Sequence, residues 1–347
     1  MNALKNGDWL RNSAPPTPRP PHSAPLRKFV ACLRFSLVIF FLLLTFSACN
    51  RHTRKRIAVI PKGQAHLFWQ SVHAGAIAAA RDANVEILWN GPASETDFNG
   101  QLQITEAMIT QRVDAICLAP IDKTSMISIV DRAARENIPV IIFDSPVDTQ
   151  SFVAQVATDN YGAGVMAAQR MGKILNGKGK IAEVAVEPGA ASTMAREQGF
   201  EDTIKKDFSG IQIVDKRYGW ADRAKSLDVA ENMLTAHSDL AAMFASNESS
   251  AVGAAQAIKG RNTKVRLVGF DWSPGLLDDL KAGRIDSLVV QDPFRMGHDA
   301  VLSAVEKLKG DTPQRIQNLP PRVVTKENLD DPEVAKQLHP DLDRYLK

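Results

Sequence analysis

Leu234–Ile258 reads LTAHSDLAAMFASNESSAVGAAQAI, and this stretch contains the pattern that decides the fold. Its middle is a short, continuous apolar run at 240–247, which ends in the polar residue Asn247. A run that is apolar on both faces is typical of a strand buried inside a parallel sheet. The small and apolar residues of 249–259 then recur with the period of a helix. The stretch therefore predicts one strand–turn–helix unit of an α/β fold.

The same alternation of strands and helices extends in both directions along the chain. Further strands are expected at 56–61, 85–90, 114–120, 139–146, 180–187, 211–218, 265–271 and 286–292. Further helices are expected at 68–83, 99–112, 124–137, 161–175, 192–206, 222–236, 274–282 and 295–310. Because the alternation restarts after 152–160, we expect two Rossmann-like lobes, each built on a doubly wound parallel sheet.

Polar residues directly follow the apolar runs of four predicted strands. They are Asp144, Asn247, Asp271 and Gln291. Any one of them could simply cap the next helix or form a turn. Ligands of open α/β sheets, however, bind beyond the carboxyl ends of the strands. Since the four residues are spread over both lobes, they favour a polar cleft that the lobes share.

Aromatic residues make up only 6% of the chain, yet several fall at strand-to-helix junctions. They are Phe68, Trp69, Trp220 and Trp272. Aromatic rings stack on the apolar faces of sugar rings, while carboxylate, amide and guanidinium groups bind the hydroxyls. The alternative for each aromatic residue is packing in the core or in a lid. Together with the polar strand ends, they favour a carbohydrate-type ligand.

Sequence signatures of common catalytic sites are missing from the chain. It contains no GxSxG, GxGxxG, GxxxxGK[ST] or HExxH motif, and its seven histidines lack metal-ligand spacing. Cys117, within the apolar run DAICLAP, is interpreted as a small core residue. We therefore expect a binding protein with no cofactor and no metal, although missing motifs do not exclude an enzyme.

The formal net charge of +3 comes from the N-terminal segment. Residues 1–49 contain six of the 42 basic residues and one of the 39 acidic ones, which leaves 36 basic and 38 acidic residues, a net charge of −2. This mildly acidic body lacks the basic surface that nucleic acid binding requires, so no nucleic acid partner is expected.

The N-terminal segment also contains an apolar run at 35–46, preceded by Lys28 and Arg34 and followed by small residues. A run of about a dozen residues is shorter than the roughly 20 of a membrane span, and its flanks are those of a secretory signal. The alternative is an uncleaved N-terminal anchor helix. FSAC at 46–49 resembles the lipobox of bacterial lipoproteins, which would make Cys49 the lipidated residue and 49–55 a short tether.

Seven motifs, in order along the chain, resemble the periplasmic sugar-binding proteins of ABC importers, of the ribose-binding type. They are LFWQSVHAGA (67–76), PVIIFD (139–144), TDNYGAG (158–164), STMAREQGF (192–200), the stretch 234–258 quoted above, LVGFD (267–271) and VVQDPFRMG (289–297). The resemblance runs from about Ile57 to about Val324. It implies a type I periplasmic binding protein, in which a ligand between two lobes draws them closed by hinge motion.

The resemblance implies which residues contact the ligand. They are His66, Phe68, Trp69, Asp144, Arg196, Trp220, Asn247, Asp271 and Gln291. Two positions depart from the ribose binders: Ser145 replaces an arginine after the first carboxylate, and His66 replaces an asparagine. Loss of a charged donor removes a hydrogen bond worth about 1.5–3 kcal/mol. The departures therefore argue against ribose itself as the ligand.

The resemblance also implies the domain organisation. The segments would be a lipoprotein signal peptide (1–48), an N-terminal lobe (56–157 and 292–320), a C-terminal lobe (158–291 and 321–325) and a surface extension (326–347). Hinges would lie near 157–158, 291–292 and 320–321.

The predicted function is capture of a small sugar-like ligand, a monosaccharide or similar polyol, and its delivery to the permease of an ABC importer. The protein is expected to be a monomer, lipid-anchored in the periplasm or on the outer face of the cell membrane. One alternative is a receptor that presents its ligand-bound form to a sensor kinase or chemoreceptor. Others are an enzyme on this scaffold and a sugar-sensing transcription regulator, although 1–50 offers a Pro-rich segment and an apolar run instead of a helix-turn-helix.

Overall fold

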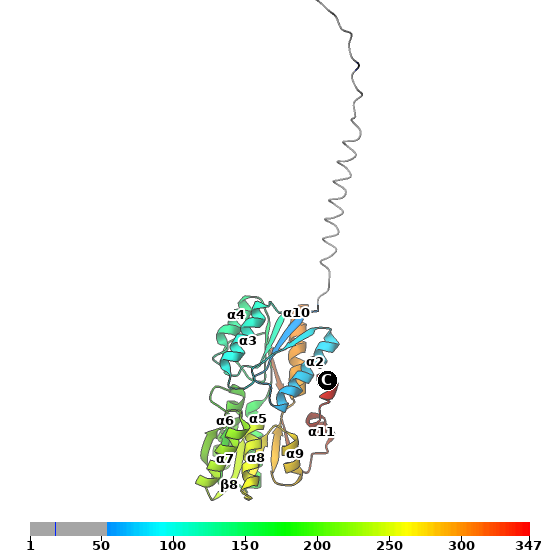
Figure 1. The fold of residues 1–347 in the computed structure, drawn as a ribbon. Helices are drawn as coiled ribbons and strands as arrows, with labels where there is room; N and C mark the ends of the chain where they lie inside the picture. The colour runs from blue at the N-terminus through cyan, green and yellow to red at the C-terminus, as the bar shows by residue number, and fades with distance from the viewer. Residues whose placement is uncertain (1–17, 19–53) are drawn as a thin grey trace, which may run out of the picture. The chain divides into compact units, whose positions relative to one another are not determined.

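Two sheets of six strands form the frame of the protein (Figure 1). The computed structural model describes Pro18 and residues 54–347, and residues 54–347 make up one structural unit. The predicted signal segment, with Cys32 and Cys49, lies outside the described residues.

The first sheet is parallel throughout and has the strand order β11-β5-β4-β3-β1-β2. Its strands are β1 (Arg56–Ile60), β2 (Glu86–Trp89), β3 (Ala115–Leu118), β4 (Val140–Phe143), β5 (Ala154–Thr158) and β11 (Ile316–Leu319). The helices around it are α2 (Leu67–Ala83), α3 (Phe98–Thr110), α4 (Ile127–Arg135) and α10 (Pro293–Lys309). Apolar residues of α2 and α10 pack on one face, and those of α3 and α4 pack on the other.

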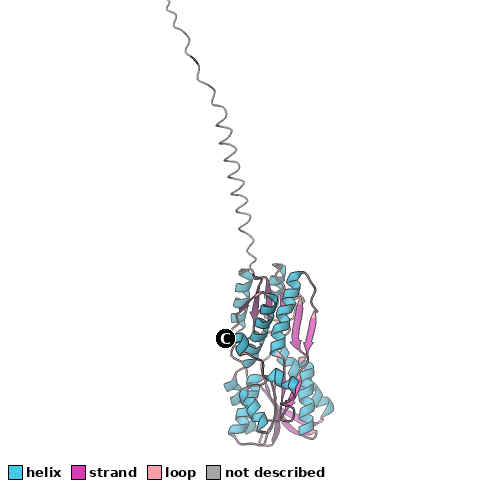
Figure 2. Ribbon diagram, turned by 90° about the vertical axis from the view of Figure 1, so that its right-hand side faces the viewer, coloured by secondary structure: helices cyan, strands magenta, loops and turns pink. Residues whose placement is uncertain are grey.

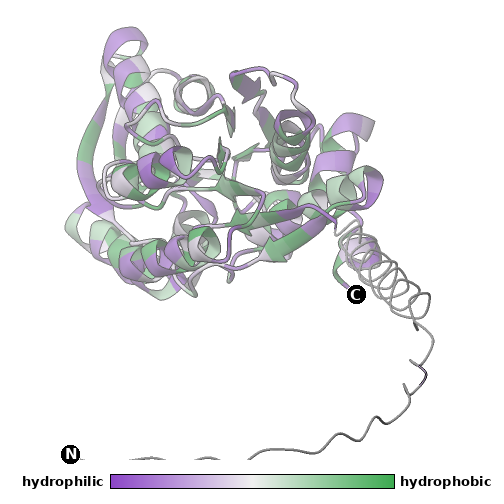
Figure 3. Cartoon of the chain, turned by 90° about the horizontal axis from the view of Figure 1, so that it is seen from above, coloured by the Kyte–Doolittle hydropathy of each residue, from purple (hydrophilic) through white to green (hydrophobic). Residues whose placement is uncertain are grey.

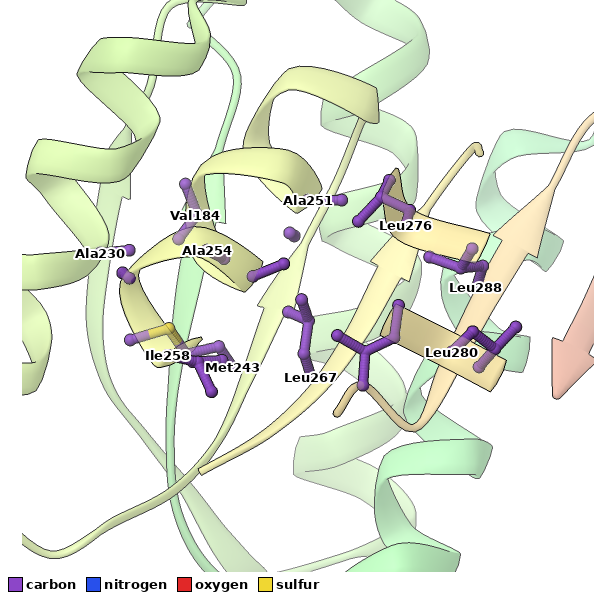
Figure 4. Close-up of a cluster of buried hydrophobic side chains, with 14 of the residues drawn as sticks. Val184, Ala230, Met243, Ala251, Ala254, Ile258, Leu267, Leu276, Leu280 and Leu288 are labelled. Atoms are coloured by element: carbon purple, nitrogen blue, oxygen red, sulfur yellow. The ribbon is translucent and has the colours of Figure 1, made fainter. Parts of the chain in front are cut away.

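The second sheet has the order β12-β10-β9-β8-β6-β7 and is parallel except for β12. Its strands are β6 (Lys178–Ala185), β7 (Gly210–Tyr218), β8 (Leu240–Ala245), β9 (Arg266–Phe270), β10 (Ser287–Val290) and β12 (Arg322–Thr325). Its helices are α5 (Asn160–Ile174), α6 (Ala191–Asp207), α7 (Arg223–Ala236), α8 (Glu248–Gly260) and α9 (Pro274–Lys281). Helices α5 and α6 cover one face, while α7, α8 and α9 cover the other, where Figure 4 shows apolar side chains between the helices and the strands. Figure 2 shows the strands with helices packed around them.

The opening stretch shows why these residues form a doubly wound fold. In β8, Met243 faces the core beneath α8, and its neighbour Phe244 faces the core beneath α5 and α6. Successive side chains of a strand point to opposite faces, so a strand covered on both faces must be apolar throughout. Figure 3 shows this hydrophobic character along the strands and a mixed character on the surrounding helices. The predicted α/β fold of two doubly wound sheets is confirmed.

Three strands, β5, β11 and β12, were not predicted, and the last two are short. Their sequences, IQNL and RVVT, are only four residues long and partly exposed, which hides the pattern of a buried strand. They form edges of different sheets, because the chain crosses from the first sheet to the second at Pro320–Pro321. Within residues 54–347 the chain also crosses after β5 and after β10.

The C-terminal segment is more than the expected surface extension. Val334 and Leu338, on α11 (Pro332–Leu338), are buried in the core of the second lobe. Tyr345, on α12 (Asp343–Leu346), instead packs against Phe294 of the first lobe, and the Arg81 guanidinium lies over its ring. The segment therefore contacts both lobes.

Cys117 is fully buried in the core of the first lobe, as predicted. Desolvation by burial raises the pKa of its thiol far above the usual value. Among the helices that the structure describes, none is both long and apolar enough to cross a membrane. The apolar run 35–46 lies outside the described residues.

Candidate functional site

The carboxyl ends of both sheets meet at a polar cleft between the lobes. Its lining consists of Lys62, His66, Phe68, Trp69, Glu95, Asp144, Ser192, Thr193, Arg196, Asn247, Glu248, Asp271 and Gln291. All but one of the predicted contact residues are therefore brought together. The enclosed space is only about 30 Å³, room for one or two water molecules. A sugar ring would enter this site only if the lobes moved apart.

Asp144 and Asp271 occupy equivalent places at the ends of β4 and β9. Both have a left-handed backbone, with φ of 61° in each case. Each backbone N–H donates to a neighbouring strand, that of Asp144 to Val156 at 3.0 Å and that of Asp271 to Val289 at 2.9 Å. Aspartate tolerates this conformation better than most residues, and strained backbone tends to occur at functional sites. The two lobes thus present a matched pair of carboxylates to the cleft.

Asp271 is held by a network from the second lobe. The Gln291 side-chain amide donates to its Oδ1 at 2.8 Å, and Nη1 of Arg196 lies 4.0 Å from its Oδ2. Desolvation by burial raises the pKa of Asp271 to about 6, because the attraction of Arg196 and the Gln291 hydrogen bond only partly offset it. The Thr158 hydroxyl, at the end of β5 in the first sheet, donates to Gln291 Oε1 at 2.7 Å and links the network to that sheet.

Arg196 is fixed on α6 by contacts on every side. Its Nε donates to Asn160 Oδ1 at 2.8 Å, its Nη1 donates to the Ser246 carbonyl at 3.0 Å, and its guanidinium lies over the Phe270 ring. The helix itself sits close against α5, because a Cβ on Gly164 would overlap the carbonyl oxygen of Arg196. The arginine is therefore preorganised beside Asp271 rather than free to follow a ligand.

Lys62 supplies a cation beside the first carboxylate. Its Nζ lies 2.7 Å from Asp144 Oδ2, with both side chains about 5% exposed, and donates to the Ser192 hydroxyl at 3.0 Å. Ser145, which stands in place of the expected arginine, instead accepts a hydrogen bond from the Ser192 backbone N–H at 3.1 Å. Lys62, just beyond the end of β1, therefore supplies the positive charge that is lost because position 145 is a serine and not an arginine. Sequence reasoning missed Lys62, although it follows an apolar strand run much as the four predicted polar residues do.

His66 and Trp69 share one partner, Glu95. His66 Nδ1 lies 2.6 Å from Glu95 Oε1, and the Trp69 indole N–H donates to the same oxygen at 2.9 Å. Burial works against both charged forms, yet the hydrogen bond between the pair outweighs it, so the pKa of His66 is raised and that of Glu95 is lowered. The Phe68 and Trp69 rings meet edge to face, with centroids 4.9 Å apart. The hydrogen bond to Glu95 and the contact with Phe68 therefore fix the Trp69 ring in the first lobe.

Trp220 is the predicted contact residue that the structure places elsewhere. It does not line the cleft, and its side chain is 43% exposed. Trp220 and Ala221 both have a left-handed backbone, with φ of 56° and 51°. This turn redirects the chain before α7, which local sequence does not reveal. Trp272 also lies outside the cleft lining, and it packs against the second-lobe core and near His339.

The model of the Periplasmic binding protein domain matches residues 57–312 of this chain. The chain belongs to the periplasmic binding protein family. An extracytoplasmic location follows from that family, and the predicted resemblance is confirmed.

Several curated and solved proteins similar to this periplasmic binding protein are sugar-binding proteins by name. The ribose import binding protein of Bacillus subtilis is 31% identical over 67% of this chain and 75% of its own length. The D-ribose/D-allose-binding protein of Pseudomonas aeruginosa is 30% identical over 83% and 93%. A carbohydrate transporter solute binding protein from Agrobacterium radiobacter, in complex with D-arabinose, is 32% identical, with a TM-score of 0.81 over 83% of this chain and all of that one.

Contacts across the cleft show that this periplasmic binding protein is in a closed arrangement. Lys62 and Ser145 of the first lobe are both hydrogen-bonded to Ser192 of the second, and the Lys123 backbone N–H donates to the Gly189 carbonyl at 3.2 Å. Such contacts join opposite lobes and must break when the lobes separate. The closed state therefore has its own stabilising contacts, which a ligand would supplement.

Proposed function

We propose that this periplasmic binding protein captures a small neutral sugar or polyol between its lobes and delivers it to the permease of an ABC importer. The observation that carries the proposal is the convergence of Asp144, Asp271, Arg196 and Gln291 on one cleft. Carboxylates accept hydrogen bonds, guanidinium groups donate them and amides do both, which suits the mixed hydroxyls of a sugar. The sugar-binding relatives support the same class of ligand.

Charge pairing in the cleft supports a neutral ligand. Lys62 faces Asp144, His66 faces Glu95, Arg223 faces Glu248 and Arg196 faces Asp271. A charged ligand would need an opposite charge that is not already neutralised nearby. A neutral polyol can instead replace the hydrogen bonds of water without disturbing these pairs.

The mechanism is differential binding, with no bond made or broken. Ligand contacts from both lobes exist together only when the lobes are closed, so the ligand shifts the equilibrium toward closure. We assign the lobes to 56–157 with 292–320 and to 158–291 with 321–325, with hinges at the three crossings. Closure would present both lobe surfaces to the permease, and the receptor would act as a monomer.

A thermal-shift screen of the purified protein against a library of sugars and polyols tests the proposal. A ligand that binds only the folded state stabilises it by about 2.7 kcal/mol at 100 times its Kd. We expect at least one neutral sugar to raise the melting temperature by several degrees. If no sugar or polyol does so at millimolar concentration, while charged solutes do, the proposed ligand class is wrong.

We also propose that Cys49 carries the lipid anchor, with 1–48 removed as a signal peptide and 49–55 as the tether. The apolar run, its basic flank and FSAC support this assignment. Cys49→Ala should abolish labelling of the protein by an alkyne fatty acid in cells. Cys32→Ala is the matched control and should leave labelling unchanged. Labelling that persists in Cys49→Ala would overturn the assignment.

A further inference from the structure

A second cavity adjoins the cleft at the His66–Glu95 pair. This outer cavity has a volume of about 280 Å³ and shares His66 and Glu95 with the cleft. Its remaining walls come from both lobes, and they are Gly63, Ala65, Ala93 and Ser94 in the first and 221–224 in the second. The cleft and the outer cavity are therefore neighbours, with the His66–Glu95 pair in the wall of both.

We propose that the outer cavity is a second subsite, and that the ligand is a sugar ring linked to another neutral polar unit, as in a disaccharide or glycoside. This inference rests on the proposed function and extends it. The cleft alone encloses about 30 Å³, whereas ligand sites usually offer about 300–1,000 Å³. The adjoining outer cavity, at about 280 Å³, is itself close to the lower end of that range.

The chemistry of the walls selects a neutral polar unit. Glu95 is paired with His66, and the Arg223 guanidinium contacts Glu248 at 2.5 Å. The Asp222 carboxylate accepts from the Lys225 backbone N–H at 2.8 Å. Glu95 and Arg223 are thus already paired with opposite charges, and the Asp222 carboxylate caps α7, so a neutral unit fits these walls better than an ionic one. Arg223 is nevertheless 48% exposed, so it can still donate to a hydroxyl.

The wall from the second lobe has a fixed shape. Trp220 and Ala221 hold a left-handed backbone just before α7, and the Trp220 N–H donates to the Val186 carbonyl at 2.9 Å. Arg223 of this wall donates to Glu248, a residue of the cleft lining that also accepts from the Phe68 backbone N–H of the first lobe at 3.4 Å. A unit bound in the outer cavity would thus contact both lobes and stabilise their closed arrangement.

Calorimetric binding of the full chain tests the subsite. The probes are the neutral monosaccharides that raise the melting temperature, with their methyl glycosides and disaccharides. We expect at least one disaccharide or glycoside to bind tenfold or more tightly than its parent monosaccharide. Ala224→Phe, at an exposed position of the outer wall, should weaken that longer ligand at least tenfold and the monosaccharide by less than twofold.

Ala236→Phe is the matched control, since it makes the same change at the exposed far end of the same helix, and it should alter neither affinity. The subsite is ruled out if monosaccharides bind and none of their glycosides or disaccharides binds. It is also ruled out if Ala224→Phe weakens both kinds of ligand equally. If neither monosaccharides nor longer sugars bind, the proposed sugar-binding function is wrong as well. That result differs from the two outcomes that rule out the subsite alone.

Discussion

Asp271→Asn is expected to stabilise the fold at pH 7 while weakening ligand binding at least tenfold. The pKa of Asp271 is raised from 3.8 to about 6, so its buried charge costs about 3 kcal/mol of stability above pH 6. That cost disappears as the pH falls from 6 toward 3.8, where the folded state takes up the proton. Asparagine keeps the shape, tolerates the left-handed backbone and carries no charge.

Urea unfolding of wild type and variant between pH 4 and pH 8 measures the effect. The variant should gain little near pH 4 and up to about 3 kcal/mol above pH 6. Glu187, whose pKa burial raises to about 7, is present in both proteins and cancels in the difference. Asp278→Asn, the same change on the exposed surface of α9, should alter neither stability nor binding. A difference that stays constant with pH would contradict the prediction.

The loss of binding has a separate cause. A hydrogen bond to an ionised carboxylate is worth about 1.5–3 kcal/mol, and 1.4 kcal/mol is one decade in Kd. Wild-type affinity should therefore fall as the pH drops below 6 and Asp271 is protonated, whereas the affinity of Asp271→Asn should lack this step. A variant that is more stable and binds less well would show that this carboxylate is retained for the ligand.

The strand-end residues could be predicted because the fold itself places them. In parallel sheets the carboxyl end of every strand lies at the same edge, so Asp144, Asn247, Asp271 and Gln291 follow from where the apolar runs stop. For Asn247, the alternative role as a helix cap is also correct. Its side chain caps α8 by accepting from the Ser250 N–H at 2.9 Å, and it lines the cleft as well.

Other residues of the cleft could not be predicted from local pattern. Glu95 lies in an irregular segment between β2 and α3, and it becomes a cleft residue only through His66 and Trp69. Glu248 reads as an acidic residue in the first turn of a helix, and its contact with Phe68 depends on the opposite lobe. Trp220 was predicted to line the cleft and does not, because the left-handed backbone of Trp220 and Ala221 turns the chain there. Tertiary contacts decide such positions.

The second large effect is expected for Lys62→Met. This change leaves the Asp144 carboxylate buried without its cation, and breaking one side of a buried ion pair costs about 3–5 kcal/mol. Urea unfolding at pH 7 should show a loss of that size, and calorimetry should show ligand affinity at least tenfold lower. Lys123→Met is the control: its pair with Asp148 is 39% and 48% exposed, and exposed pairs contribute about 0–1 kcal/mol.

The double variant Lys62→Met with Asp144→Asn separates the two roles of the pair. Removing both charges should restore stability to within about 1 kcal/mol of wild type, because no unpaired charge is left buried. Asparagine is chosen since position 144 has a φ of 61°. Binding should remain at least tenfold weaker, because the ligand has then lost both charged groups. If the double variant is no more stable than Lys62→Met alone, the pair does not set stability. If the double variant binds like wild type, the pair serves the fold and not the ligand.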